Sequence, residues 1–150
     1  MKNTQRVLNE LVVQIFDDIL KIEEKTLKQG ALSDLSVTEM HTLEAIGMYT
    51  QRTMSEVALD LKITVGTLTT AINKLIKKDY VARKRIEEDR RVVLVELTKK
   101  GKLAYRLHEK FHNDMITATI DGLSDGEEKV LISSLEKLNN FFKAKNESIE

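Results

Sequence analysis

The sequence predicts a mainly α-helical fold that contains one small β-hairpin. Apolar residues recur at helical spacing along most of the 150 residues. A serine or threonine followed three places later by glutamate marks three helix starts. Two short runs that contain tyrosine and valine, 80–85 and 92–97, are instead typical of paired strands.

Four helices are expected before the hairpin. The first covers about 5–27, where leucine, valine and isoleucine form a wide apolar stripe that ends before Gly30. The second and third begin at the capping boxes Ser36-Val-Thr-Glu39 and Thr53-Met-Ser-Glu56. The fourth runs over about 64–78 and turns its leucine and isoleucine side chains inward.

The hairpin and two further helices complete the expected order. The charged segment 86–91 joins the two strands. Thr98 caps a helix that continues to Gly122, and about 23 residues give it a length of roughly 34 Å, more than a small core requires. Ser124-Asp-Gly-Glu127 opens the last helix.

Charge is distributed unevenly although the chain is neutral as a whole. Residues 62–110 hold 14 Lys and Arg against 6 Asp and Glu, a net charge of +8, and the remainder therefore carries −8. This pattern indicates either a surface that binds a polyanion or a set of solvated helix faces balanced by their neighbours.

Composition also bounds the cellular setting. The apolar runs are too short to span a bilayer, so no membrane association is expected. The first residues lack the basic-then-apolar order of a signal peptide, and there is no cysteine. A cytoplasmic location is the expectation.

The middle of the chain has the element order of a winged helix-turn-helix: a helix, a tight turn, a second helix and a charged hairpin. In such a motif the second helix reads the major groove of double-stranded DNA. Hydroxyl groups on that helix can bond phosphates and base edges, methyl groups can meet thymine methyls, and the Asn73 amide can pair with adenine. The other interpretation is an N-cap at Thr64 followed by a solvated face. The candidate DNA-binding residues of the helix are Thr64, Val65, Gly66, Thr67, Thr69, Thr70, Asn73, Lys74 and Lys77, followed by Lys78.

The predicted hairpin and the residues after it carry a motif that resembles one of a known protein family. Asp89-Arg90-Arg91, followed by Leu97-Thr98-Lys-Lys-Gly101, resembles the wing signature of the multiple-antibiotic-resistance-regulator (MarR) family. The resemblance implies that Asp89 braces a wing arginine while Arg90 or Arg91, together with Arg85, reaches the DNA.

The MarR resemblance also implies how the chain is divided. Segments 1–33 and 99–150 would be dimerisation helices of a single MarR-like chain, and 34–98 would be the winged helix-turn-helix lobe. The partners implied are a second copy of the chain and pseudo-palindromic DNA.

Within that family the chain resembles the repressors of fatty-acid-synthesis genes of streptococci and lactic-acid bacteria. The matching segments are Glu39-Met-His-Thr42, 63–71, 87–93 and 106–112. This likeness implies an acyl chain on acyl carrier protein as corepressor. An apolar cavity could hold that chain, or its residues could be ordinary core. The candidate ligand-binding residues are Phe16, Leu20, Met40, His41, Leu43, Leu107, His108, Phe111, His112 and Met115.

The three histidines allow two further hypotheses. His108-Glu-Lys-Phe-His112 matches the H-E-x-x-H motif of zinc hydrolases, but the chain offers no evident third ligand or active-site sheet, so an enzyme is not expected. A zinc-sensing branch of the MarR family is similar at Glu24, His41, His108 and His112. The alternatives are that these histidines hydrogen-bond across the first, second and fifth predicted helices, or that they face the polar mouth of the acyl cavity. No resident metal or cofactor is expected.

Overall fold

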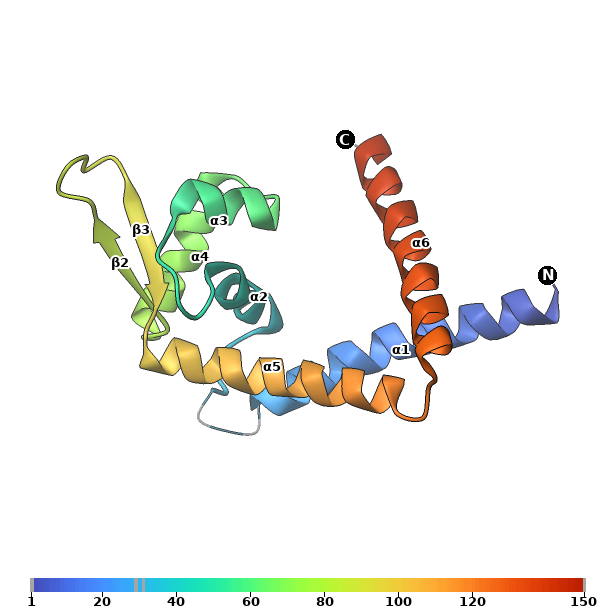
Figure 1. Ribbon diagram of the computed structural model, residues 1–150. Coiled ribbons are helices and arrows are strands. Elements are labelled where there is room, and N and C mark those ends of the chain that lie inside the picture. The colour runs from blue at the N-terminus through green and yellow to red at the C-terminus, as the bar shows by residue number, and fades with distance from the viewer. Residues whose placement is uncertain (1, 29, 31, 150) are drawn as a thin grey trace. The chain divides into compact units, whose positions relative to one another are not determined.

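Figure 1 shows the computed structural model, which describes residues 2–28, 30 and 32–149. Over these residues the chain forms six α-helices and three short strands, so the predicted mainly helical fold with a hairpin is confirmed. The elements are α1 (Asn3–Lys28), α2 (Val37–Ile46), β1 (Arg52–Thr53), α3 (Met54–Leu61), α4 (Val65–Lys77), β2 (Val81–Arg85), β3 (Val93–Leu97), α5 (Lys99–Ile120) and α6 (Asp125–Ile149).

Side-chain caps explain where the helices begin. The Ser36 hydroxyl accepts a bond from the Glu39 amide at 3.1 Å, and the Glu39 carboxylate accepts one from the Ser36 amide at 3.0 Å, which completes the predicted capping box. Ser124 and its following glutamate form the same pair at the start of α6. Thr53 forms only half a box, because its hydroxyl, rather than its amide, donates to Glu56.

The three strands form one antiparallel sheet in the order β1-β3-β2. The predicted hairpin pairs Val81 with Leu97 and Arg85 with Val93. An additional strand, β1, pairs Arg52 with Val95 and was not predicted. Two residues are too few to show the alternation by which a strand is recognised, and their partners lie more than forty positions along the chain.

The hydrophobic core lies under the sheet and between α2, α3 and α4. Its fully buried side chains include Met40, Leu43, Ile46, Val57, Leu68, Ile72, Leu75, Tyr80 and Val95. The first turn of α5 packs against the backbone of Tyr80, since a Cβ at Gly101 would stand 2.1 Å from the Tyr80 carbonyl oxygen. Glycine at this position therefore allows α5 to join the lobe.

The chain divides into two compact units, 1–109 and 110–150. The first unit contains the helix-turn-helix and the sheet, and the second contains the end of α5 and α6. This boundary differs from the predicted one at 98/99, and the predicted dimerisation role of the terminal segments stays a prediction. None of the helices formed by the described residues has the length and apolar character that a membrane span requires.

Candidate nucleic-acid interface

The recognition helix α4 follows α3 after a three-residue turn. Lys62 ends α3 in the left-handed conformation, with φ of 57°, and this reverses the chain direction within a few residues. Thr64 then caps α4 by accepting a bond from the Thr67 amide at 3.1 Å. Leu68, Ile72 and Leu75 hold α4 against the core, which leaves its opposite face exposed beside the hairpin (Figure 1).

The threonine hydroxyls of α4 bond within the helix. Thr69 donates to the Val65 carbonyl at 2.8 Å and Thr70 to the Gly66 carbonyl at 3.4 Å. These protons are therefore directed at the backbone, where a phosphate oxygen cannot accept them. For Thr69 and Thr70, the groups that remain for DNA are the hydroxyl lone pairs and the methyl groups, which suit base edges better than phosphates.

Asn73 is held from the wing. A guanidinium nitrogen of Arg83, on β2, donates to Asn73 Oδ1 at 2.9 Å. Both side chains are exposed, so the contact lies on the surface where α4 meets the hairpin. The predicted role of Asn73 in base readout remains a prediction, but its amide now has a defined orientation.

A concavity of about 380 Å³ separates the first turns of α3 and α4 from the wing. Three arginines line it, together with Thr53, Ser55 and Thr69 from the starts of the two helices. The cationic side chains on this concave surface are suited to a polyanionic backbone. Its lining residues are Thr53, Met54, Ser55, Val65, Thr69, Arg83, Arg85, Arg91, Val92 and Val93.

Internal bonds brace the wing loop as the MarR resemblance implied. Asp89 accepts two bonds from the Arg91 side chain, at 3.0 and 3.2 Å, and one from the Arg91 amide. Bonding to the Arg91 side chain, and to a lesser degree to the Arg91 amide, holds the pKa of the Asp89 carboxyl below its usual range. Arg85 bonds the Arg90 carbonyl at 2.8 Å.

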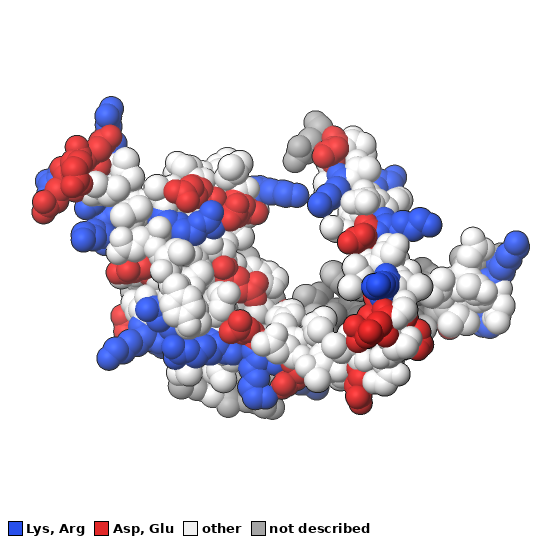
Figure 2. Space-filling model, viewed as in Figure 1, with Lys and Arg blue, Asp and Glu red and all other residues white. Residues whose placement is uncertain are grey.

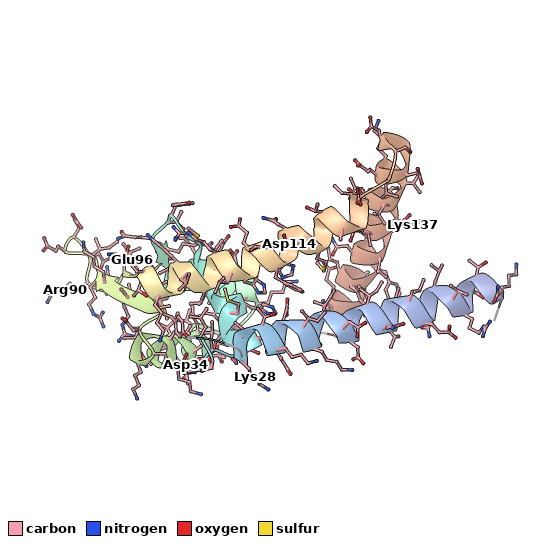
Figure 3. The ribbon with its side chains drawn as sticks, turned by 90° about the horizontal axis from the view of Figure 1, so that it is seen from below. Lys28, Asp34, Arg90, Glu96, Asp114 and Lys137 are labelled. Atoms are coloured by element: carbon pink, nitrogen blue, oxygen red, sulfur yellow. The ribbon has the colours of Figure 1, made fainter. Side chains whose placement is uncertain are left out.

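The outer wing is mixed in charge. Acidic side chains, Glu87 and Glu88 among them, gather at its tip beside basic ones (Figure 2). Arg90 lies at the outer end of the hairpin (Figure 3), and the Arg91 side chain is 91% exposed. The two arginines are therefore accessible to DNA, whereas the acidic tip disfavours a phosphate directly beneath it.

The lysines of α4 separate into two groups. Lys74 and Lys77 are exposed, as their predicted role in DNA binding requires. Lys78 was expected to follow them, but its ammonium group bonds the Asp34 carbonyl and the Glu39 carboxylate, at 2.9 Å to the latter. Lys78 therefore joins α4 to the start of α2 and is not part of the exposed face.

A second polar cluster lies between α1, α2 and α5. The buried His108 side chain contacts Glu44 and lies 3.9 Å from the buried Glu23 carboxylate. Glu23, His41 and His108 each offer one ligand atom, and these atoms lie within 4.8 Å of one another. The predicted Glu24 is exposed and lines a different concavity, because one residue along a helix turns the side chain by about 100°.

The residues expected to line an acyl cavity have different environments. Met40 and Leu43 are fully buried in the lobe core, whereas Phe16, Leu20 and Leu107 are exposed. His41 and His108 belong to the polar cluster just described. Phe111, His112 and Met115 lie in the second unit. The cavity stays a prediction.

Six residues that line the concavity were not among the predicted DNA-binding residues: Thr53, Met54, Ser55, Arg83, Val92 and Val93. A usable signal existed for one of them. Alternation along β2 places Arg83 and Arg85 on the same face of the strand, so the prediction for Arg85 applied equally to Arg83.

This arrangement of recognition helix, basic concavity and braced wing defines a winged helix-turn-helix DNA-binding protein. The family model described as transcriptional regulator SarA/Rot matches residues 24–107. The chain belongs to this family of MarR-like winged-helix regulators. It is a DNA-binding transcriptional regulator and not an enzyme.

Individual relatives agree with the family match. The crystal structure of Streptococcus pneumoniae FabT in complex with DNA is 43% identical, covers 95% of this chain and 99% of that one, and has a TM-score of 0.84. A MarR protein from Peptoclostridium difficile is 26% identical, covers 96% and 92%, and has a TM-score of 0.70. The transcriptional regulator PchR of Bacillus subtilis is 23% identical over 90% of this chain and 89% of its own length.

Proposed function

We propose that the chain is a homodimeric repressor of fatty-acid-synthesis genes, and that acyl chains on acyl carrier protein strengthen its binding to a pseudo-palindromic operator. The observation that carries the proposal is the 43% identity to FabT over nearly the whole of both chains. The segments that resemble fatty-acid-synthesis repressors support it, since they include the recognition helix and the wing.

The surface of α5 offers a place for such a carrier to bind. Lys99, Lys102 and Arg106 recur at spacings of three and four residues and so share one face of the helix. The exposed Leu103 and Leu107 lie beside this basic stripe. Acyl carrier protein is acidic, so the basic stripe would attract the carrier while the leucines meet its acyl chain. Arg83 and Lys84 of β2 are further candidates for the same attraction.

A ligand can change DNA affinity only if it binds one arrangement of the dimer better than another. Two recognition helices on successive major grooves must stand about 34 Å apart. In this proposal the acyl chain favours the arrangement with that spacing, and the repressor therefore binds its operator more tightly when acyl carrier protein is loaded.

The test is an operator-binding titration in chelator, with long-chain acyl carrier protein and with the unacylated carrier as control. The acylated form alone should strengthen binding, and the effect should weaken as salt rises. Leu107→Asp and Phe111→Asp should each abolish the response, whereas Tyr49→Asp, at an exposed lobe residue outside the predicted cavity, should leave it intact. An operator affinity that the acylated carrier leaves unchanged would overturn the proposal.

A zinc-responsive regulator is the second candidate, favoured by the convergence of Glu23, His41 and His108. A carboxylate and two imidazoles form a common zinc ligand set, with the metal acting as an effector. Under this hypothesis chelator removes DNA binding, zinc restores it, and His41→Ala with His108→Ala reproduces the effect of the chelator. Indifference of DNA binding to both chelator and zinc would eliminate this candidate.

A further inference from the structure

The contact between Arg83 and Asn73 restricts what the recognition helix can show to a base pair. An asparagine amide has one oxygen, which accepts, and one NH2 group, which donates twice. A guanidinium only donates, so its contact at 2.9 Å has to be with the Asn73 oxygen. The NH2 group is then turned away from Arg83 and left for other partners.

The orientation of the Asn73 amide matters because Asn73 lies on the exposed face of α4. Gly66, Thr70, Asn73 and Lys77 lie near the middle of the exposed face, opposite the buried Leu68, Ile72 and Leu75. Arg83 reaches Asn73 from the side of the helix that adjoins the wing concavity, which Val65 and Thr69 also line. The Asn73 oxygen is thus engaged at the wing side of the exposed face.

Adenine recognition by asparagine needs both halves of the amide. The NH2 group donates to adenine N7 while the oxygen accepts from the adenine N6 amino group. The amide oxygen has two lone pairs, and the bond from Arg83 leaves one of them for a base. An adenine amino group that used it would have to lie beside the positively charged guanidinium, which disfavours its approach. Guanine N7 and O6, or thymine O4, are acceptors and meet the NH2 group without this conflict.

We infer that Arg83 is a positioning residue that biases Asn73 toward donation through its NH2 group, so that the base facing it is guanine or thymine in preference to adenine. This assignment rests on DNA binding by α4 and is independent of the acyl or zinc response. It replaces the pairing with adenine that the residue type alone suggested, and it gives the wing a part in base selection.

Selection of duplexes from a randomised DNA pool by the full-length protein tests the inference. The position whose base preference disappears in Asn73→Ala is the one that Asn73 reads, and the wild type should favour guanine or thymine there. Arg83→Ala should admit adenine, so that discrimination at this position falls by about tenfold. Arg83→Lys, which keeps a donor, should restore the preference. Asn73→Asp, which carries only acceptors, should move it toward cytosine or adenine.

Lys84→Ala is the matched control, because it removes one positive charge from the opposite face of the same strand. It should lower affinity for all duplexes alike and change no base preference. Thermal unfolding should show that every variant is folded. Three outcomes overturn the inference: adenine at the Asn73 position in the wild type, a preference that Asn73→Ala leaves intact, or an Arg83→Ala variant that behaves as Lys84→Ala does.

Discussion

The Tyr80 hydroxyl donates a 2.6 Å hydrogen bond to the Asp34 carboxylate and so joins the segment before α2 to the start of the wing. The Tyr80 side chain is fully buried, and the Lys100 ammonium lies 4.4 Å from its ring centre. Burial, followed by the bond to Asp34, raises the pKa of the Tyr80 hydroxyl well above its usual range. The pKa of Asp34 is lowered, chiefly by the same bond, with attraction from Lys100 adding to it.

Stability should therefore depend on Asp34 in acid. A carboxyl whose folded-state pKa lies below the unfolded value of 3.8 stabilises the fold above that pH, and this contribution is lost as pH falls through the folded-state pKa. Tyr80→Phe should lower the free energy of unfolding by about 1 kcal/mol at pH 7. Asp34→Asn should flatten the decline of stability below about pH 4.

Urea unfolding at pH 7 and pH 3 measures both effects. Asp121→Asn, at an exposed carboxyl outside this cluster, should keep the pH profile of the wild type. Equal stability of Tyr80→Phe and the wild type at pH 7 would show that the bond contributes nothing to the fold.

Gly66 is expected to serve DNA binding and not the fold. A Cβ at this position would find only the Thr64 hydroxyl, at 3.9 Å, and alanine favours a helix over glycine by about 1 kcal/mol. Gly66→Ala should raise the melting temperature and weaken operator binding by tenfold or more, because a methyl group would separate α4 from the groove. Gly126→Ala, in the first turn of α6, is the control that should leave DNA binding unchanged. Unaltered operator affinity in Gly66→Ala would exclude close approach at this turn.

Arg90 and Arg91 of the wing loop should act on affinity more than on sequence preference. Arg91→Ala removes an exposed cation that Asp89 holds in place, and should weaken operator binding by about tenfold with unchanged helical content. If Arg91 contacts a phosphate, the plot of log binding constant against log salt concentration should become less steep by about one unit in this variant. Asp89→Asn should give a smaller loss, since it frees the arginine without removing it. Full affinity of both Arg90→Ala and Arg91→Ala would remove the wing from the interface.

Assembly can be tested at α6. No described side chain of this helix is buried within the single chain, and Val130, Leu135 and Phe142 are more than half exposed. An apolar surface of this kind is typical of a subunit interface. Deleting 124–150 should therefore yield an unfolded or aggregated chain, because obligate dimers often lack a stable monomer. Sedimentation of the full chain should give the mass of a dimer, and Leu135→Asp with Phe142→Asp should reduce it. A folded monomer from the deletion would contradict the proposed dimer.

Helix order and helix starts could be predicted because their causes are local. Ser36, Thr64 and Ser124 each bond an amide three residues away, so neighbouring residues contain the whole signal. The hairpin was equally accessible, since Val81–Arg85 and Val93–Leu97 pair across a short loop. The wing brace could be inferred because Asp89 and Arg91 are two residues apart.

By itself, then, the amino-acid sequence determined the six helices, the hairpin, the charged wing and the exposed face of α4. Tertiary structure alone decided that β1 joins the sheet, that Glu23 and not Glu24 faces His108, and that Lys78 turns back to Glu39. It also decided that Arg83 holds the oxygen of Asn73. Each of these contacts joins different elements, so its geometry depends on how those elements pack. The spacing of residues along a single segment carries no information about that packing.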